Sequence, residues 1–356
     1  MRVTLIGPPQ SGKSMLFSAV AVAGGSHVDL SRGDQPHMAM VKVPDERLEW
    51  LSEHYKPEKT TPAELEFIDL PGLDLSDDAG RTRARAHWAA MRQSDMLVFV
   101  VRAFEQSDAP AYRDRVDPQA DVEELIGEMI FADMDQVSSR IDKLHASIKK
   151  PSRDHKDEQR ELELMERLLA ALENEKPIST ALTSDAEGKL VRSFAFLSQK
   201  PMLVVLNCGE DSLGEPAPEK VHGLPALQLS AQIESEIAQL PPAERQEFQA
   251  DLGLTGSARD RLVQACYSGL GLISFLTSGE DECRAWTIPA GTEAVVAAAE
   301  IHSDIARGFI RAETVSYADF RSAGDFKNAR AAGKVRLEGK NYVVQDGDII
   351  NFRFNV

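Results

Sequence analysis

The first residues able to do chemistry lie near the start of the chain, just after a short apolar run. Residues 7–14 read Gly-Pro-Pro-Gln-Ser-Gly-Lys-Ser and fit the pattern G-x-x-x-x-G-K-S/T at every position. In such a loop the backbone N–H groups point inward around nucleotide phosphates, and the following helix adds its positive N-terminal end. The residues expected to contact the nucleotide here are Gln10, Ser11, Gly12, Lys13, Ser14 and Met15.

Two side chains of this segment have specific chemical roles. The ammonium group of Lys13 can neutralise the β and γ phosphate oxygens, and the hydroxyl of Ser14 can complete the coordination shell of Mg²⁺. A strand-like run at 3–6 precedes the loop, and a helix-length apolar run at 15–23 follows it. Because the motif requires this context, we prefer phosphate binding to a coincidental turn.

A second motif, Asp-Leu-Pro-Gly at residues 69–72, follows another strand-like run. The carboxylate of Asp69 can hold Mg²⁺ through water, and Gly72 leaves its N–H free for a γ-phosphate. Four such residues also make a plain turn, but their place at a strand end, about 55 residues after the loop, favours the functional interpretation. We therefore expect Ser14 and Asp69 to bind the metal, and Lys13 and Gly72 to be catalytic.

The element that reads the base is expected after the apolar run 202–206, where the chain continues Asn207, Cys208, Gly209, Glu210. Ras-type GTPases have Asn-Lys-x-Asp here, and their aspartate accepts from guanine N1–H and the 2-amino group. Cysteine replaces the lysine and a longer acid replaces the aspartate, which compromises guanine pairing and favours adenine. Asn207 can still reach the purine N7 edge, and a second base-contacting loop is expected at Ser230 and Ala231. A plain turn after the strand is the alternative.

These side chains need a parallel sheet to position them. Strand, glycine-rich turn and helix open an α/β unit, and the continuous apolar runs 96–101 and 201–206 are typical of central parallel strands. Between them lies a helical interruption whose apolar residues alternate spacings of four and three, which predicts an antiparallel helical hairpin. That seam is Ile130, Met134, Val137, Ile141, Leu144 and Ile148, facing Leu162, Met165, Leu168, Leu169 and Leu172.

The tip of this hairpin, at residues 149–153, is locally basic. An ordinary solvated turn explains it, and contact with RNA or a ribosome is the alternative.

The tail differs from the rest of the chain in charge and in pattern. Residues 284–356 hold 10 basic and 9 acidic side chains, whereas the other 283 residues hold 30 and 48. Strands at 284–288, 309–317 and 349–354 around a helix at 292–301 predict a small β-grasp sheet. A hairpin is expected where 335–337 and 342–344 flank the turn 338–341. The tail is the part most suited to an anionic surface.

Composition excludes several classes of protein. The formal net charge of −17 argues against a protein that coats nucleic acid without specificity. The three cysteines are far apart, which argues against a disulfide framework or a zinc site and fits a reducing cytosol. No apolar run reaches the roughly 18 residues needed to span a bilayer, and the N-terminal run leaves no room for a signal peptide.

In order along almost the whole chain, these motifs resemble the YchF/Obg-like ATPases, P-loop proteins related to translation factors. The resemblance implies a P-loop NTPase domain, an inserted antiparallel α-helical coiled coil, a C-terminal TGS domain, ribosome association and a preference for ATP with Mg²⁺. We place these domains at 1–120 with 200–280, at 121–199 and at 281–356. The resemblance rests on residues 7–14, 43–48, 66–69, 72–73, 101–105, 116–118, 121–123, 207–210, 229–236, 284–288, 301–304, 307–313 and 337–348.

The chain departs from the family where hydrolysis is concerned. The family's metal-binding switch threonine falls at Gly33, with Ser31 and Asp34 as nearby alternatives, and its loop histidine falls at Ala111. Leu73 stands where Ras-type enzymes orient water with glutamine. We therefore expect a slow ATPase switch in the cytoplasm. The alternatives are a nucleotide-binding regulator with little hydrolysis and a GTPase with relaxed base specificity.

His87 is nearby in sequence, on an expected helix. A lone helical histidine is more often a packing or surface residue than a catalytic one, so we assign it no catalytic role.

Overall fold

The computed structural model describes residues 1–23, 35–105, 110–150, 155–213, 215–252, 254 and 256–355. The predictions for Gly33, Ser31 and Asp34, and most of the basic turn after Lys150, lie outside these residues. The chain divides into two compact units. The first comprises Met1–Ala39 and Glu66–Ser257, and the second comprises Met40–Leu65 and Ala258–Val356.

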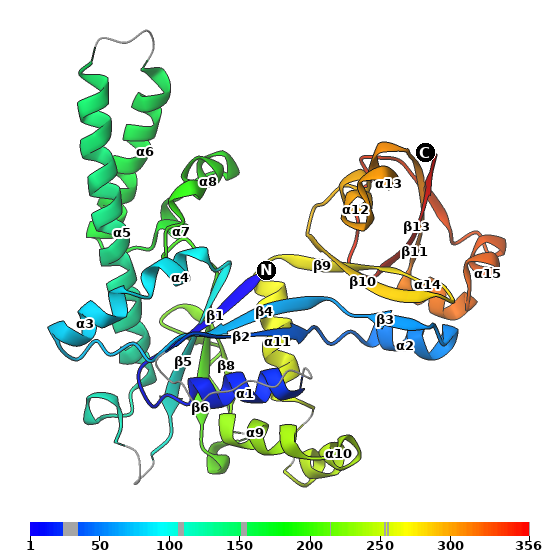
Figure 1. The fold of residues 1–356 in the computed structure, drawn as a ribbon, viewed down its shortest axis with the longest axis horizontal. Coiled ribbons are helices and arrows are strands. Elements are labelled where there is room, and N and C mark those ends of the chain that lie inside the picture. Colours follow the sequence, from blue (N-terminus) through cyan, green and yellow to red (C-terminus); the bar gives the residue numbers. More distant parts are fainter. Residues whose placement is uncertain are drawn as a thin grey trace. The chain divides into compact units, whose positions relative to one another are not determined.

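The first unit contains a mostly parallel sheet with the order β2-β4-β1-β5-β6-β8-β7 (Figure 1). Strands β1, β4, β5, β6 and β8 pair in parallel, and the short β7 runs antiparallel to β8. β5 and β6 are buried along almost their whole length, as their continuous apolar sequences predicted. The strands are β1 (Arg2–Ile6), β2 (His37–Lys42), β4 (Glu64–Asp69), β5 (Met96–Ala103), β6 (Met202–Cys208), β7 (Lys220–Val221) and β8 (Leu224–Leu229).

Helices connect these strands. α1 follows β1 directly and packs against α9. The helices around the sheet are α1 (Lys13–Ala23), α3 (Asp78–Arg85), α4 (Trp88–Gln93), α9 (Ala231–Gln239) and α10 (Pro242–Asp251). A strand, a glycine-rich turn and a helix therefore open the unit. This order confirms the predicted α/β class.

Between β5 and β6 the chain leaves the sheet as a helical hairpin, α5 (Pro118–Ile148) and α6 (Lys156–Glu173) (Figure 1). Asp117 accepts a hydrogen bond from the Ala120 N–H, and Pro118 takes the first turn, where a missing N–H costs nothing. On α5 the predicted seam residues Ile130, Val137, Ile141 and Leu144 are buried, and Met134 and Ile148 are half-buried. On α6 Leu164 is buried in place of Leu162 and Leu169, which are half-buried. Two short helices, α7 (Ile178–Ala181) and α8 (Asp185–Val191), lead back to β6.

The first turn of α5 contains a buried carboxyl group with an unusual titration. Burial raises the pKa of Asp121 to about 6, against the opposing charge of Arg115, whose guanidinium lies 3.1 Å away. In the unfolded chain the same group titrates near 3.8. Because the folded-state pKa is the higher one, the protonated group stabilises the fold below about pH 4, and this stability is lost as the pH rises through 6.

We expect Asp121→Asn to remove the loss of stability between pH 4 and pH 7. The substitution should raise the free energy of unfolding at pH 7 by about 1–3 kcal/mol. Urea unfolding at pH 4, 6 and 8 measures the effect. Glu123→Gln, on an exposed position of the same turn, is the matched control. Parallel pH profiles for Asp121→Asn and the unmodified chain would contradict the expectation.

The second unit contains a sheet with the order β12-β11-β13-β9-β10-β3 (Figure 1). Its core includes Phe275, Ile288, Ala297 and Phe352, which pack around α12. The strands are β3 (Lys59–Thr61), β9 (Leu272–Thr277), β10 (Glu282–Pro289), β11 (Phe309–Ser316), β12 (Arg336–Glu338) and β13 (Asp348–Phe354). The helices are α2 (Glu46–Tyr55), α11 (Ala258–Gly269), α12 (Ala294–Ile301), α13 (Ser303–Arg307), α14 (Tyr317–Ala323) and α15 (Phe326–Ala331).

The tail sheet includes more of the chain than the expected β-grasp strands. β9 pairs with β10 and β13, and β3 pairs with the far edge of β10, so strands from before residue 281 complete it. The division into three domains at the stated boundaries stays a prediction.

The expected hairpin between 335–337 and 342–344 is wrong. β12 pairs instead with β11, so that Leu337 lies opposite Glu313, and Val343 makes only an isolated bridge to Glu293. The reason is that the backbone of 342–344 is engaged elsewhere. Val344 N–H donates to the Thr292 carbonyl at 3.0 Å, and the Tyr342 carbonyl accepts from Ala294 N–H at 2.8 Å. The segment therefore covers the start of α12 instead of extending the sheet.

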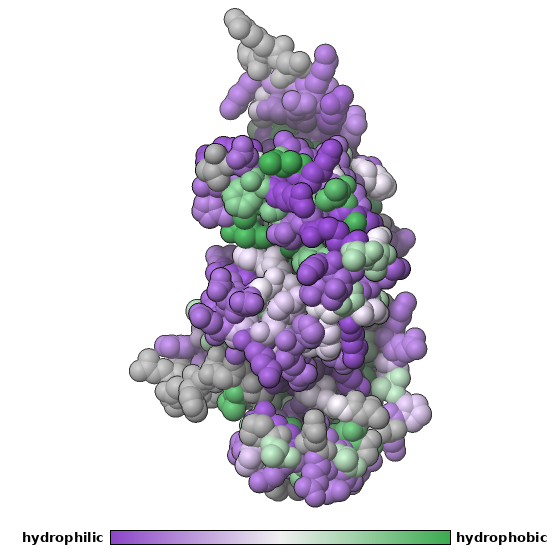
Figure 2. All heavy atoms as spheres, turned by 90° about the vertical axis from the view of Figure 1, so that its right-hand side faces the viewer, coloured by the Kyte–Doolittle hydropathy of each residue, from purple (hydrophilic) through white to green (hydrophobic). Residues whose placement is uncertain are grey.

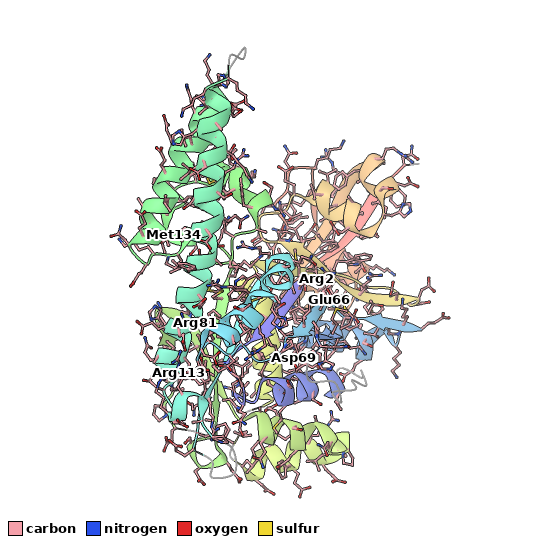
Figure 3. The ribbon with its side chains drawn as sticks, turned by 60° about the vertical axis from the view of Figure 1, so that its left-hand side comes forward. Arg2, Glu66, Asp69, Arg81, Arg113 and Met134 are labelled. Carbon is pink, nitrogen blue, oxygen red and sulfur yellow. The ribbon has the colours of Figure 1, made fainter. Side chains whose placement is uncertain are left out.

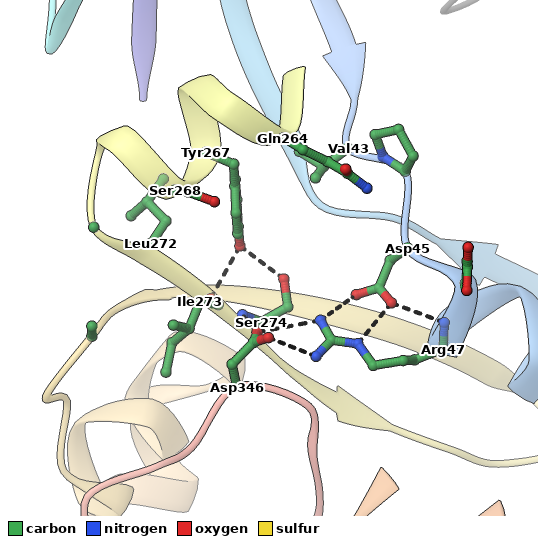
Figure 4. Close-up of a pocket in the computed structure, with 14 residues that line it drawn as sticks. Val43, Asp45, Arg47, Gln264, Tyr267, Ser268, Leu272, Ile273, Ser274 and Asp346 are labelled. Atoms are coloured by element: carbon green, nitrogen blue, oxygen red, sulfur yellow. Dashed lines mark hydrogen bonds and ion pairs between the residues drawn. The ribbon is translucent and has the colours of Figure 1, made fainter. Parts of the chain in front are cut away.

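A cavity of about 600 Å³ in the second unit borders an ion-pair cluster (Figure 4). Arg47 donates to Asp45 at 2.8 Å and to Asp346 at 2.7 Å, and Asp346 also accepts from the Ser274 N–H. Hydrogen bonds from Arg47 to Asp45, and then to Asp346, raise the pKa of Arg47. Since every charge of the cluster is paired, we assign it the structural role of joining α2 to the turn before β13.

The side of the molecule that Figure 2 turns to the viewer is largely hydrophilic, and its apolar surface is broken into separate small patches. Within the described residues, no helix combines the length and the apolar character needed to cross a bilayer.

Candidate nucleotide-binding site

The loop between β1 and α1 has the backbone of a phosphate cradle. Gln10 and Gly12 take φ angles of 59° and 85°, in the left-handed region. A Cβ at Gly12 would overlap the side-chain amide of Asn207, and a Cβ at Gly7 would overlap the Val100 carbonyl oxygen. Close packing therefore requires both glycines of the motif, and the positive φ favours glycine at Gly12 as well.

Lys13 and Asp69, predicted from two separate motifs, are in contact. The Lys13 ammonium donates to Asp69 Oδ1 at 2.6 Å and also to the Leu70 carbonyl oxygen. Both side chains are buried, with exposed fractions of 5% and 3%. The positive charge and the carboxylate of the site are thus brought to one point at the carboxyl ends of β1 and β4, where ligands of open α/β sheets bind.

The second carboxylate oxygen of Asp69 faces a histidine that the sequence analysis did not single out. His37 Nδ1 lies 3.9 Å from Asp69 Oδ2, and it is buried without a hydrogen-bond partner among the described residues. The His37 ring lies beside Phe17 of α1, with 6.4 Å between ring centroids. No spacing rule points to His37, which begins an edge strand, so only the fold reveals it.

Gly72 lies against the cradle, as expected for a residue that follows the second motif. A Cβ at Gly72 would come within 3.0 Å of Pro9 Cα, and the neighbouring Leu73 N–H donates to the Gly7 carbonyl at 2.9 Å. The Gly72 N–H makes no hydrogen bond with any described residue. This arrangement leaves a backbone donor at the edge of the cradle, where a terminal phosphate would need one.

The remaining cradle residues fit a phosphate chain with a hard divalent cation. Ser11 Oγ is buried without a partner in the described part of the chain, so this hydroxyl is available to a ligand. Ser14 and Met15 are exposed at the start of α1. The Ser14 hydroxyl and the Asp69 carboxylate are oxygen donors, the type that Mg²⁺ prefers.

Asn207 joins the cradle to the second expected base loop. Its Nδ2 donates to the Ser11 carbonyl at 2.9 Å, and its Oδ1 accepts from the Ala231 N–H at 2.9 Å. Ser230 caps α9 by accepting from the Ile233 N–H. The structure therefore brings Asn207, Ser230 and Ala231 to the cradle.

Cys208 and Glu210 are placed differently from Asn207. Successive side chains of a strand point to opposite faces, and Cys208 lines a separate cavity of about 410 Å³ together with Gln228. Burial raises the pKa of the Cys208 thiol. Glu210 is exposed after the end of β6. A nucleotide contact by either residue stays a prediction.

The loop after Gly72 is tied to the base of the helical hairpin through one residue. The Leu75 N–H donates to the Tyr112 hydroxyl at 3.0 Å, and the Leu75 carbonyl accepts from Arg113 at 2.9 Å and from Arg81 at 3.2 Å. Glu124 of α5 accepts from Tyr112 and Arg113, and Figure 3 shows Arg81 and Arg113 at this end of α5. A shift of this loop would therefore move the groups that bind Glu124 of α5.

Two positions weighed for hydrolysis are visible near this region. Ala111, just before Tyr112, has only a methyl group, so the expected absence of a loop histidine leaves no titratable side chain there. His87 is half-buried between α3 and α4, and burial and the charge of Lys13 lower its pKa.

Comparison with known proteins decides the family. The chain is 40% identical over 363 residues to the Bacillus subtilis protein named "Ribosome-binding ATPase YchF", covering 99% of this chain and 98% of that protein. The chain belongs to the YchF family. Two family models match as well: YchF-GTPase_C, described as "Protein of unknown function (DUF933)", at residues 272–355, and a model described as "50S ribosome-binding GTPase" at residues 2–137.

Membership of the YchF family extends across the whole length and to the fold. The Caenorhabditis elegans protein "Obg-like ATPase 1" is 32% identical over 371 residues, covering all of this chain and 92% of that protein. The solved structure of the Schizosaccharomyces pombe YchF GTPase superposes with a TM-score of 0.85 at 26% identity, covering 99% of this chain and 97% of that one. The resemblance and the fold class predicted from the sequence are thus confirmed.

Proposed function

We propose that this YchF-family chain is a P-loop ATPase that binds ATP with Mg²⁺ and associates with ribosomes in the cytoplasm. The observation that carries the proposal is the cradle in which Lys13 and Asp69 meet beside the free N–H of Gly72. Lys13 and Gly72 would act on the γ-phosphate, and Ser14 and Asp69 would hold the cation. The names of the Bacillus subtilis and Caenorhabditis elegans relatives support ATP as the nucleotide.

The base preference follows from the residues after β6. No lysine stands beside Asn207, and Cys208 turns into a different cavity, so a guanine would find neither the lysine nor the aspartate that Ras-type enzymes present. A GTPase remains the second candidate, because the family model at residues 2–137 is described as a GTPase. Titration with non-hydrolysable ATP and GTP analogues separates them: tighter GTP binding would overturn the adenine preference.

Turnover is proposed to be slow. Leu73 is buried and has no polar atom to orient water, and Ala111 supplies no acid or base. A phosphate-release assay with ATP measures this property. Release above background supports the ATPase, whereas tight ATP binding without release supports a nucleotide-dependent regulator.

Association with ribosomes is tested by sedimentation of purified protein with ribosomes, with and without a non-hydrolysable ATP analogue. The names of several relatives support this partner. Recovery of the protein in the ribosome pellet, changed by the analogue, is the expected result. A chain that stays in the supernatant under both conditions would overturn this part of the proposal.

One face of the second unit suits an anionic partner such as ribosomal RNA. Arg311 of β11 and Arg353 of β13 are cross-strand neighbours, and Arg330 of α15 shares Glu313 Oε1 with Arg353. Burial alone would raise the pKa of Glu313, but hydrogen bonds from Arg353, Arg330 and Asn351 outweigh it and lower that pKa. Arg311 is exposed and forms no ion pair with any described residue, so this face carries an excess of positive charge.

We expect Arg311→Glu to weaken ribosome binding by about tenfold, and more at low salt, because the new carboxylate removes one cation and neutralises Arg353 across the strands. The fold should stay intact, because the new carboxylate at position 311 pairs with Arg353 on the neighbouring strand. Sedimentation at two salt concentrations measures the effect, and ATP affinity should not change. Arg160→Glu, on the exposed surface of α6, makes the same change in net charge and serves as the control. Equal loss in both variants would exclude a specific face.

A further inference from the structure

His37 lies beside the Asp69 carboxylate at the end of the cradle. Its Nδ1 is buried, has no hydrogen-bond partner among the described residues and faces Asp69 Oδ2 across 3.9 Å. The other oxygen of Asp69 is occupied by Lys13 at 2.6 Å. An unsatisfied buried ring nitrogen is costly for stability, so its presence calls for a functional explanation.

The separation of the two atoms is informative. At 3.9 Å it is too long for a hydrogen bond. Two ligands that each lie about 2.1 Å from one divalent ion are at most about 4.2 Å apart, so the measured gap is within reach of a shared cation. His37 lies beside Phe17, and the Asp69 side chain is only 3% exposed, so both groups are confined.

The chemistry of the donors then bears on which cation is preferred. Mg²⁺ selects oxygen ligands and gains little from imidazole, whereas transition-metal ions accept imidazole nitrogen together with carboxylate and hydroxyl oxygen. The His37 ring nitrogen and the Asp69 carboxylate combine these donor types at one place, and the Ser14 hydroxyl at the start of α1 is a further oxygen donor. Because His37 contributes nitrogen, it should favour Mn²⁺ more than it favours Mg²⁺.

We propose that His37 is a ligand of the divalent cation that accompanies the nucleotide, and that it makes this chain favour Mn²⁺ over Mg²⁺. The inference rests on the proposed binding of ATP at the cradle. It adds a residue to the site that neither phosphate-binding motif contains, and it assigns His37 a role in metal specificity.

The test uses the full chain with a non-hydrolysable ATP analogue and Mn²⁺ as the paramagnetic probe. Electron spin-echo envelope modulation should show coupling of Mn²⁺ to a histidine nitrogen, and the signal should change when the histidines are labelled with ¹⁵N. His37→Asn should abolish this coupling, whereas His302→Asn, at an exposed position of the other unit, should retain it.

A second measurement compares the affinity for the analogue with each metal. The ratio of Mn²⁺-supported to Mg²⁺-supported affinity is expected to fall about tenfold in His37→Asn, the usual scale for changes around a metal ligand. The labelled, unmodified chain gives an answer even if the variant does not fold. Binding of the analogue with Mn²⁺ but without nitrogen coupling would overturn this inference, whereas no binding with either metal would overturn the proposed function itself.

Discussion

Replacing Lys13 with methionine is expected to weaken ATP binding by about 10- to 150-fold. Methionine keeps most of the volume but removes the ammonium group, and a hydrogen bond to a charged partner contributes about 1.5–3 kcal/mol. The group is almost fully buried at the end of the cradle, so solvent screens little of its attraction for phosphate. Isothermal titration with a non-hydrolysable ATP analogue measures the loss directly.

The same substitution also affects the protein without nucleotide. Lys13 pairs with the buried Asp69, and its removal leaves a carboxylate with no cation, which destabilises a fold by about 3–5 kcal/mol. Adding Asp69→Asn to Lys13→Met relieves that charge, so thermal unfolding of both variants separates stability from affinity. Lys59→Met, at an exposed residue of the second unit, is the control. Unchanged ATP affinity in Lys13→Met would remove the basis of the proposed function.

Local sequence patterns predicted the parts of the molecule that are determined locally. The cradle follows from eight consecutive residues, and the buried strands follow from continuous apolar runs such as 96–101. The helical hairpin follows from a heptad repeat that needs no knowledge of the rest of the chain. In each case the physical signal and the structure it produces lie in the same segment.

Contacts between distant segments were not predictable in the same way. The side-chain amide of Asn207 connects Ser11 with Ala231, and no local pattern encodes that geometry. The segment 342–344 has strand-like residues, but its backbone partners lie at the start of α12. His37 acquires its setting only when β2 joins the sheet beside β4. In all three cases the contacts depend on segments that are far apart in the sequence.

A large loss of stability is also expected for Asp133→Ala, in the middle of α5. The carboxylate is completely buried, and it accepts from the Leu197 N–H at 2.9 Å, from the Ser198 N–H at 2.7 Å and from the Ser198 hydroxyl at 2.8 Å. Arg92 of α4 completes the shell with a hydrogen bond of 3.1 Å. One side chain therefore holds the helical hairpin, α4 and the segment before β6 together.

Truncation to alanine leaves those donors and the Arg92 charge without an acceptor in the interior, and we expect the free energy of unfolding to fall by about 3–5 kcal/mol. Asp133→Asn should cost less, because the amide oxygen keeps one acceptor while its NH₂ group opposes the remaining donors. Asp135→Ala, exposed two residues further along the helix, should change stability by less than about 0.5 kcal/mol.

Urea unfolding followed by the fluorescence of Trp88, with Trp50 and Trp286 replaced by phenylalanine, reports on the first unit. If Asp133→Ala and Asp135→Ala unfold at the same urea concentration, the buried carboxylate does not hold these elements together, and the hairpin depends on its apolar seam alone.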